Sequence, residues 1–454
     1  MTMQDGNTIN VTRVIDDSPI RGFQIAVFVL CSLAAFLDGI DTQNIGSAAP
    51  IIAANMALTR AALGPVFSSA LVGATLGALT FGPLGDKYGR KIMLALAVFL
   101  FGIFTIATAY AQTYQQLLAI RFLAGIGMGG ATPCFIALAS EFAPARRRAM
   151  VASVIWSAFP LGGFVGGFLN AYVLQMFGWQ AIFLIGGVLP ILITLAFIVW
   201  LPESLKFLIA KGGETARIEA IVRRLQPGLP ANAHFVSNEQ RVDGVRFMHL
   251  FSDGRALWTL LLWVPFFAAF GVLIVAVLWT PTLLHDNGIP LAEAVRAIAF
   301  NGLGALIGMS AAGRLIERFG AAPVLVPAFL LGAITTALLG YAAASSVGMA
   351  LGVFLVGLFI GMGGSGAIAL AALTYPTAIR STGVGWAMGV GRFAQVLSPL
   401  FAGIVTGAGW SSVQLFVVLA IAPVLAALAI IVLRTLPAHR PAAETISAPE
   451  AVAS

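Results

Sequence analysis

The octapeptide Gly82-Pro-Leu-Gly-Asp-Lys-Tyr-Gly89 recurs as Gly313-Arg-Leu-Ile-Glu-Arg-Phe-Gly320, 231 residues further along the chain. Both copies have a glycine at each end and an acid, a base and an aromatic residue before the last glycine. Two more stretches recur at nearly the same offset, 125–130 at 359–364 and 141–148 at 374–380. Three matches in register predict a duplicated fold whose two halves have the same orientation.

The composition places both halves in a membrane. Of the 454 residues, 59% are hydrophobic and only 9% are charged, whereas a soluble domain carries about 25% charged residues. The polar surface needed to cover soluble domains is therefore missing. Runs of roughly 20 apolar residues predict membrane-spanning helices, and we expect twelve of them. They lie at 23–51, 61–82, 92–110, 116–140, 149–174, 180–200, 257–282, 293–312, 322–343, 347–372, 383–406 and 411–433.

The runs divide the chain into five parts, and the fold class we predict is an all-α membrane protein with two parallel six-helix halves. The parts are an N-terminal tail at 1–22, a bundle at 23–200, a partly helical central loop at 201–256, a second bundle at 257–434 and a tail at 435–454 that we expect to be disordered from Pro437. Parallel halves related by an axis along the membrane normal are typical of transporters, which bind their substrates between the halves near the midplane.

The basic residues predict the orientation, because cytoplasmic loops carry an excess of lysine and arginine. One side holds only Arg60 and Arg296. We assign the other side, and both termini, to the cytoplasm. The net charge of +7 then reflects topology, and nucleic-acid binding is not expected. The residues on the basic side are Arg13, Arg21, Lys87, Arg90, Lys91, Arg146, Arg147, Arg148, those of the central loop, Arg314, Arg318, Arg380, Arg434 and Arg440.

Two carboxylates, Asp38 and Asp41, lie in the middle of the first apolar run. An ionised side chain at the bilayer centre costs about 2.5 to 3.5 kcal/mol or more, so such a residue indicates function. A spacing of three residues puts both on one side of a helix, where burial and like charge favour the protonated form. We expect at least one to take up and release a proton, and we favour Asp41. A structural hydrogen bond is the alternative.

Two arginines also lie within apolar runs and act as fixed cations. For Arg121 in the fourth run we expect pairing with an acid of the first half; snorkelling to the interface is the alternative. Arg392 in the eleventh run is the candidate contact for a substrate anion, against a purely structural role. The aromatic residues Tyr375 and Trp386 could stack on a substrate ring, although core or lipid-facing packing is the more common role of such residues.

Charged groups at the ends of the runs could pair between helices in one conformation and separate in another. A solvated basic loop is the alternative, but it does not explain the repeated glycines, which indicate a tight turn. The residues we assign to this gating role are Gly82, Asp86, Gly89, Arg90, Glu141, Arg148 and Arg380.

Several chemistries have no support in the sequence. Phosphate-binding loops, zinc-protease motifs and clustered Cys/His residues are absent, so we expect no cofactor, no metal and no enzymatic activity. Cys31 and Cys134 both lie in apolar runs and are read as small buried hydrophobic residues.

The motifs resemble a known superfamily over residues 20–435. Gly82-Pro-Leu-Gly-Asp-Lys-Tyr-Gly-Arg-Lys91 resembles the loop signature of the major facilitator superfamily. Arg121-Phe-Leu-Ala-Gly-Ile-Gly-Met-Gly129 is similar to its fourth-span motif, and Pro202-Glu-Ser-Leu-Lys-Phe-Leu208 to the segment after its sixth span.

A narrower resemblance is to the aromatic acid:proton symporters. Asp38-Gly-Ile-Asp-Thr-Gln43 resembles their first-span signature, although Ile40 stands where an aromatic residue is frequent. The segment Tyr375–Arg392 is similar to their tenth-to-eleventh-span segment. This resemblance implies proton-driven import of a benzoate-like acid, such as 4-hydroxybenzoate or protocatechuate, into bacteria. We expect a monomer in the bacterial inner membrane. It also implies functional importance for Asp38, Asp41, Glu141, Arg380 and Arg392.

Two other functions compete with import. A proton-driven exporter of drugs or acids often has a G-P-x-x-G-G element in the fifth span, and here Phe159-Pro-Leu-Gly-Gly163 lacks its first glycine. A membrane sensor that binds the acid without moving it often carries an added signalling domain, for which the central loop is short.

Overall fold

A computed structural model describes residues 8–211, 215–226, 234–236, 247–252, 255–341, 346–376 and 379–436. The tail from Pro437, for which we expected disorder, lies outside these ranges, and so do Arg241, Arg246 and Arg440. Twelve helical segments within the described residues are long and apolar enough to cross a membrane, which confirms the predicted number. They are α2 Gly22–Asn55, α3 Arg60–Tyr88, α4 Arg90–Thr108, α5 Tyr114–Phe142, α6 Arg148–Phe177, α7 Trp179–Trp200, α10 Ala256–Asp286, α11 Leu291–Phe319, α12 Ala321–Leu339, α13 Ser346–Thr374, α14 Arg380–Gly407 and, as a twelfth segment, α15 Ser412–Leu419 with α16 Ile421–Thr435.

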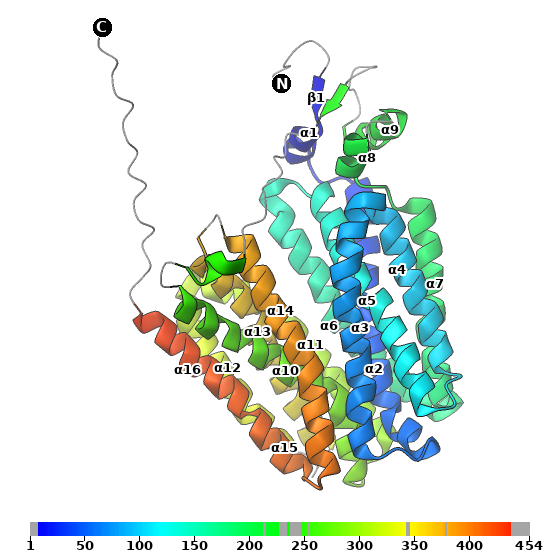
Figure 1. The fold of residues 1–454 in the computed structure, drawn as a ribbon, viewed down its shortest axis with the longest axis vertical. Helices are drawn as coiled ribbons and strands as arrows, with labels where there is room; N and C mark the ends of the chain where they lie inside the picture. Colours follow the sequence, from blue (N-terminus) through cyan, green and yellow to red (C-terminus); the bar gives the residue numbers. More distant parts are fainter. Residues whose placement is uncertain are drawn as a thin grey trace.

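The helices form two bundles with the same internal packing (Figure 1). In the first half α3 packs on α5 and α2 on α6; in the second half α11 packs on α13 and α10 on α14. Glycines allow the close approach in both copies. A Cβ atom on Gly129 would overlap the Ala74 carbonyl, and one on Gly304 would overlap the Phe354 carbonyl. The duplicated architecture predicted from the repeat is therefore confirmed.

Short elements lie at the end of the bundles that carries the charged loops. Strand β1 Thr8–Asn10 pairs in parallel with β2 His234–Val236, and the prediction of an all-α chain did not include this pair. Helix α1 Val11–Asp17 buries Val11, Val14 and Ile15 in an apolar cluster that includes residues of α8 and α9. The other short elements are η1 Ala145–Arg147, α8 Leu205–Lys211, α9 Thr215–Leu225 and η2 Phe247–Leu250.

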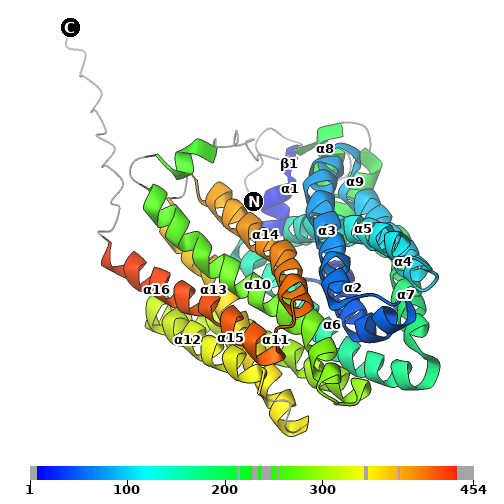
Figure 2. The same cartoon turned by 60° about the horizontal axis from the view of Figure 1, so that its bottom comes forward.

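The two halves pack tightly against each other at the opposite end, where the bundles converge (Figures 1 and 2). Arg60, at the start of α3, forms an ion pair of 3.0 Å with Asp286, at the end of α10. About two turns further along α3, Ser68 Oγ donates a hydrogen bond of 2.8 Å to the carbonyl of Val396 in α14. These contacts close one end of the interface between the halves.

Candidate functional site

The two intramembrane carboxylates of α2 face different neighbours. At about 100° per residue, Gly39 and Ile40 face α6, where a Cβ on Gly39 would overlap the Phe159 carbonyl and Ile40 packs on Gly166. Asp41 points into the first half and is 1% exposed, whereas Asp38 is partly exposed. The spacing of three residues thus gives them a common side of the helix but separate environments.

Asp41 and Arg121 form a buried ion pair between α2 and α5. Arg121 Nη2 lies 2.9 Å from Asp41 Oδ2, and Nη1 lies 3.4 Å from Oδ1. Thr105 of α4 also donates to Asp41 Oδ1, at 3.4 Å. Arg121 is only 2% exposed, so each charge offsets part of the cost of burying the other. The expected partner of Arg121, an acid of the first half, is found here.

Arg392 presents a guanidinium group from the second half toward the first. Val396 and Pro399 lie on the same face of α14 and contact α3, because residues four and seven positions apart share a helix face. Within the described part of the chain, no hydrogen bond or ion pair at contact distance occupies the guanidinium. Its charged neighbour is Asp38, with which it interacts electrostatically across the two halves.

The face of α14 that carries Arg392 borders open space one to two turns before this residue. Gly385 and Gly389 lie on the same face of the helix, and a Cβ atom built on either would meet nothing within 4 Å. A fixed cation with free donors next to open space is the arrangement that a carboxylate ligand requires.

The two aromatic candidates lie away from Arg392. Tyr375 is buried in an apolar cluster and packs against Gly383, about 13 Å along the helix axis from Arg392 at 1.5 Å per residue. Burial raises the pKa of its hydroxyl group, which stays neutral at pH 7. Trp386 is 47% exposed and points about 120° away from Arg392 around α14.

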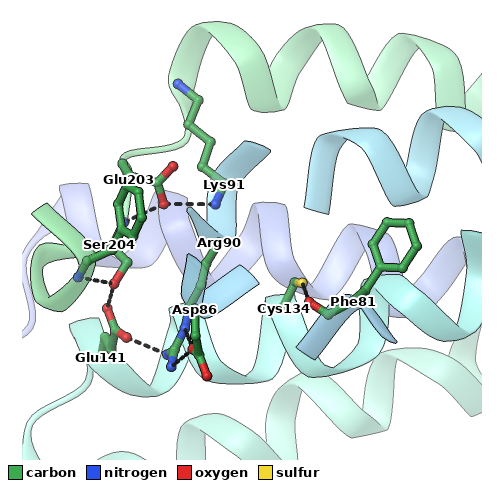
Figure 3. A network of polar contacts seen from close by, with 9 residues as sticks. Phe81, Asp86, Arg90, Lys91, Cys134, Glu141, Glu203 and Ser204 are labelled. Atoms are coloured by element: carbon green, nitrogen blue, oxygen red, sulfur yellow. Dashed lines mark hydrogen bonds and ion pairs between the residues drawn. The ribbon is translucent and has the colours of Figure 1, made fainter. Parts of the chain in front are cut away.

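A polar network at the charged end joins the loops that follow the second, fourth and sixth spans (Figure 3). Arg90 binds Asp86 at 2.9 Å and also forms an ion pair with Glu141. Glu141 in turn accepts a hydrogen bond of 2.5 Å from Ser204 Oγ. The network brings together three of the residues to which we assigned a gating role.

Glu203 extends this network and had no predicted role. Its Oε1 atom accepts hydrogen bonds from the backbone N–H groups of Lys91, at 3.0 Å, and Ser204, at 2.8 Å. Its carboxylate also occupies the position that a side chain on Gly89 would need. The only sequence signal was the resemblance of the segment at 202–208, which named no partner for Glu203.

The remaining gating candidates have separate environments. Arg148 Nε donates to the Ala143 carbonyl at 3.2 Å, and Arg380 Nε donates to the Tyr375 carbonyl at 3.5 Å. Both arginines thus reach back five residues, at positions related by the repeat. The expected tight turn is present at Gly89, where φ is +109°. It is absent at Gly82, which lies inside α3, and a Cβ there would have ordinary contacts with Pro133 at 3.8 Å.

Metal binding has no structural support among the described residues, where no three His, Cys, Asp or Glu side chains are grouped to hold an ion. Cys31 and Cys134 are free and buried.

Comparison with known proteins gives consistent results over nearly the whole chain. The family model described as Major Facilitator Superfamily matches residues 31–315 and 297–453. The chain is 35% identical to the 4-hydroxybenzoate transporter PcaK of Pseudomonas aeruginosa, covering 95% of this chain and 97% of that protein. It is 34% identical to a gallate transporter of Pseudomonas putida, covering 93% and 94%. Among solved structures, a D-xylose-proton symporter matches with a TM-score of 0.69 at 19% identity, covering 92% of this chain and 99% of that one.

Proposed function

This chain belongs to the major facilitator superfamily, and we propose that it imports an aromatic carboxylate together with protons. It is a multi-pass membrane transport protein and not an enzyme. Support for the substrate class comes from two relatives whose names specify 4-hydroxybenzoate and gallate, both aromatic acids. We favour import over export because the first-span motif and the segment that leads into the eleventh span resemble those of the aromatic acid:proton symporters.

The observation that carries the proposal is the free guanidinium of Arg392. An arginine inside a bilayer is costly and is retained where it has a partner. Arg121 has its partner in Asp41, but the donors of Arg392 are unoccupied within the described residues. A substrate carboxylate supplies two acceptor oxygens in the geometry that a guanidinium binds best.

Proton coupling is assigned to the carboxylates of α2. Both lie within a span, where an ionisable side chain is costly and indicates function. In the proposed cycle, a proton and the substrate bind from outside, the halves rock about the binding site, and both ligands are released inside. The network of Arg90, Glu141 and Ser204 holds one conformation closed and breaks when the halves rock.

The location completes the proposal. The excess of basic residues at the end that carries α1, α8 and α9 assigns that end to the cytoplasm. We place the protein in the bacterial inner membrane with both termini in the cytoplasm, and we expect a monomer. The closed contact between Arg60 and Asp286 then faces outward.

Uptake by proteoliposomes tests this function. Radiolabelled 4-hydroxybenzoate, protocatechuate, gallate and benzoate are presented to wild-type protein and to Arg392→Ala. We expect saturable uptake of at least one acid by the wild type and at least a tenfold loss of apparent affinity in the variant, because a bidentate charged contact is removed. Saturable uptake that is equal in both proteins would remove Arg392 from the site, and extrusion of preloaded acid against a proton gradient would favour an exporter.

A further inference from the structure

The segment before the first span, residues 8–18, folds back on the charged end of the first half (Figure 1). Its strand β1 pairs with β2 of the central loop, where Asn10 stands opposite Val236. Asn10 ends the strand and also caps α1, because its side-chain oxygen accepts hydrogen bonds from the backbone N–H groups of Thr12, at 3.0 Å, and Arg13, at 3.4 Å. The strand therefore leads into the helix without an intervening loop.

One face of α1 is apolar and buried. Val11, Val14 and Ile15 are 3%, 8% and 4% exposed, at the spacing that puts three side chains on one helix face. They belong to the apolar cluster that includes Leu205 of α8 and Val222 of α9, and α1 contacts α9. The hydrophobic effect stabilises the docked segment, because docking removes this face from water.

The polar side of α1 binds the loop between α5 and α6. Asp16 Oδ1 accepts a hydrogen bond of 2.7 Å from the backbone N–H of Ala145 and lies 3.7 Å from Arg148 Nη2. Gln24, at the start of α2 and fully buried, donates from Nε2 to the Phe142 carbonyl at 2.8 Å. The segment and the start of the first span thus hold both ends of this loop.

The loop follows Glu141, the residue that joins the two sides of the polar network at this end. Glu141 pairs with Arg90 and accepts a hydrogen bond from Ser204. A small cavity under α1 is lined by Thr12 and Ile15 on the side of α1 and by Glu141 on the other. The segment therefore lies directly against the network, in contact with the first half and the central loop.

We propose that residues 8–18 form a strap that holds Glu141 in the network and so stabilises the conformation in which Arg60 and Asp286 close the outer end. The proposal rests on the proposed function only through the gating role of the network. Because the network breaks when the halves rock, an element that favours the intact network also favours the conformation that contains it. Release of the strap should therefore shift the population toward the conformation that is open to the outside.

A cysteine in place of Ser68 reports opening of the outer end. Ser68 is 3% exposed and donates to the carbonyl of Val396 in the second half, so a membrane-impermeant maleimide reacts with Ser68→Cys when the halves separate there. The reporter is placed in a background in which Cys31 and Cys134 are alanine. Labelling rates are measured on intact bacteria without substrate, so the result does not depend on which acid is carried.

Asp16→Ala and Asp17→Ala form a matched pair at the end of α1. Asp16 binds the loop, whereas Asp17 is exposed, and both variants remove an acid from the same end of the helix. We expect Asp16→Ala to raise the labelling rate about three- to tenfold, because a charge-assisted hydrogen bond is lost, and Asp17→Ala to leave it unchanged. Ile15→Asp puts a carboxylate into the apolar cluster and should raise the rate further.

Loosening of the whole first half would also raise the labelling rate, so a second measurement separates the two effects. Cys31 and Cys134 of the native chain are buried within the first half. In Asp16→Ala with Ser68 unchanged, they should react with a thiol reagent as slowly as in the wild type. Faster reaction would overturn the strap, because it would show a loss of folding instead of a shift between two folded conformations.

Glu141→Gln in the same assay separates the strap from the network. Faster labelling in Glu141→Gln with unchanged labelling in Asp16→Ala and Ile15→Asp would overturn the strap and leave the gating role of the network. Unchanged labelling in all three variants would overturn both. If Ile15→Asp does not fold, the comparison of Asp16→Ala with Asp17→Ala decides. A lack of aromatic acid uptake in proteoliposomes would reject the proposed substrate class and would leave these labelling rates as they are.

Discussion

Removal of one partner of the buried ion pair tests whether Asp41 and Arg121 stabilise the first half. Both side chains are almost completely buried, at 1% and 2% exposed, so Asp41→Asn leaves an arginine charge without a partner in the bilayer interior. Loss of one member of such a pair costs about 3 to 5 kcal/mol. The double variant Asp41→Asn/Arg121→Gln removes both charges and should lose at most about 3 kcal/mol, the value of its charge-assisted hydrogen bonds.

The two native cysteines provide the assay. Cys31 in α2 and Cys134 in α5 are buried in the first half, so a fluorogenic thiol reagent reacts with them when that half opens. Thermal melts in detergent should rank the wild type above the double variant and the double variant above both single variants.

The control for this series is Arg60→Gln, which removes a half-exposed arginine and should shift the melt little. Single variants whose losses simply add up to that of the double variant would refute the coupling between the two charges.

Three further predictions concern packing and movement. Gly39→Ala should destabilise the first half by about 1 to 3 kcal/mol because its methyl group meets the backbone of α6. Gly22→Ala in the same helix has open space around its methyl group and should not, and thiol melts compare the two variants. Glu141→Gln should weaken the network around Arg90. The rate of substrate exchange, measured by counterflow, should change more than the equilibrium binding constant, measured by calorimetry. An unchanged exchange rate would show that this network takes no part in the gating movement. The double variant Arg60→Cys/Asp286→Cys, in a background without native cysteines, should form a disulfide that stops uptake until a reductant is added. Full uptake by the cross-linked protein would show that the start of α3 and the end of α10 need not separate during transport.

Hydropathy and the repeat were sufficient to predict the membrane-spanning helices and the duplicated architecture, because both are periodic features of the sequence. Pairing of Arg121 within the first half was also predictable, since a buried cation requires an acid and few were available. The electrostatic interaction between Asp38 and Arg392 was not predictable. It depends on how the two halves meet, and the repeat describes each half separately.

The features that the sequence did not predict have physical causes as well. Tyr375 and Trp386 were named only as aromatic residues that could stack on a substrate ring, and residue type alone does not give the direction of a side chain around α14. Glu203 was missed because its partners are backbone N–H groups. Every residue except proline has such a group, so the sequence does not indicate which ones a carboxylate will bind. The strands β1 and β2 are three residues each and lie more than two hundred residues apart, so neither has a recognisable pattern.

Accumulation of labelled 4-hydroxybenzoate in proteoliposomes under an imposed inward proton gradient tests the central claim most directly. We expect the wild type to concentrate the acid above its outside level and to lose this concentration when a protonophore is added. Equilibration of the acid without accumulation, at the same rate with and without the gradient, would contradict proton-coupled import.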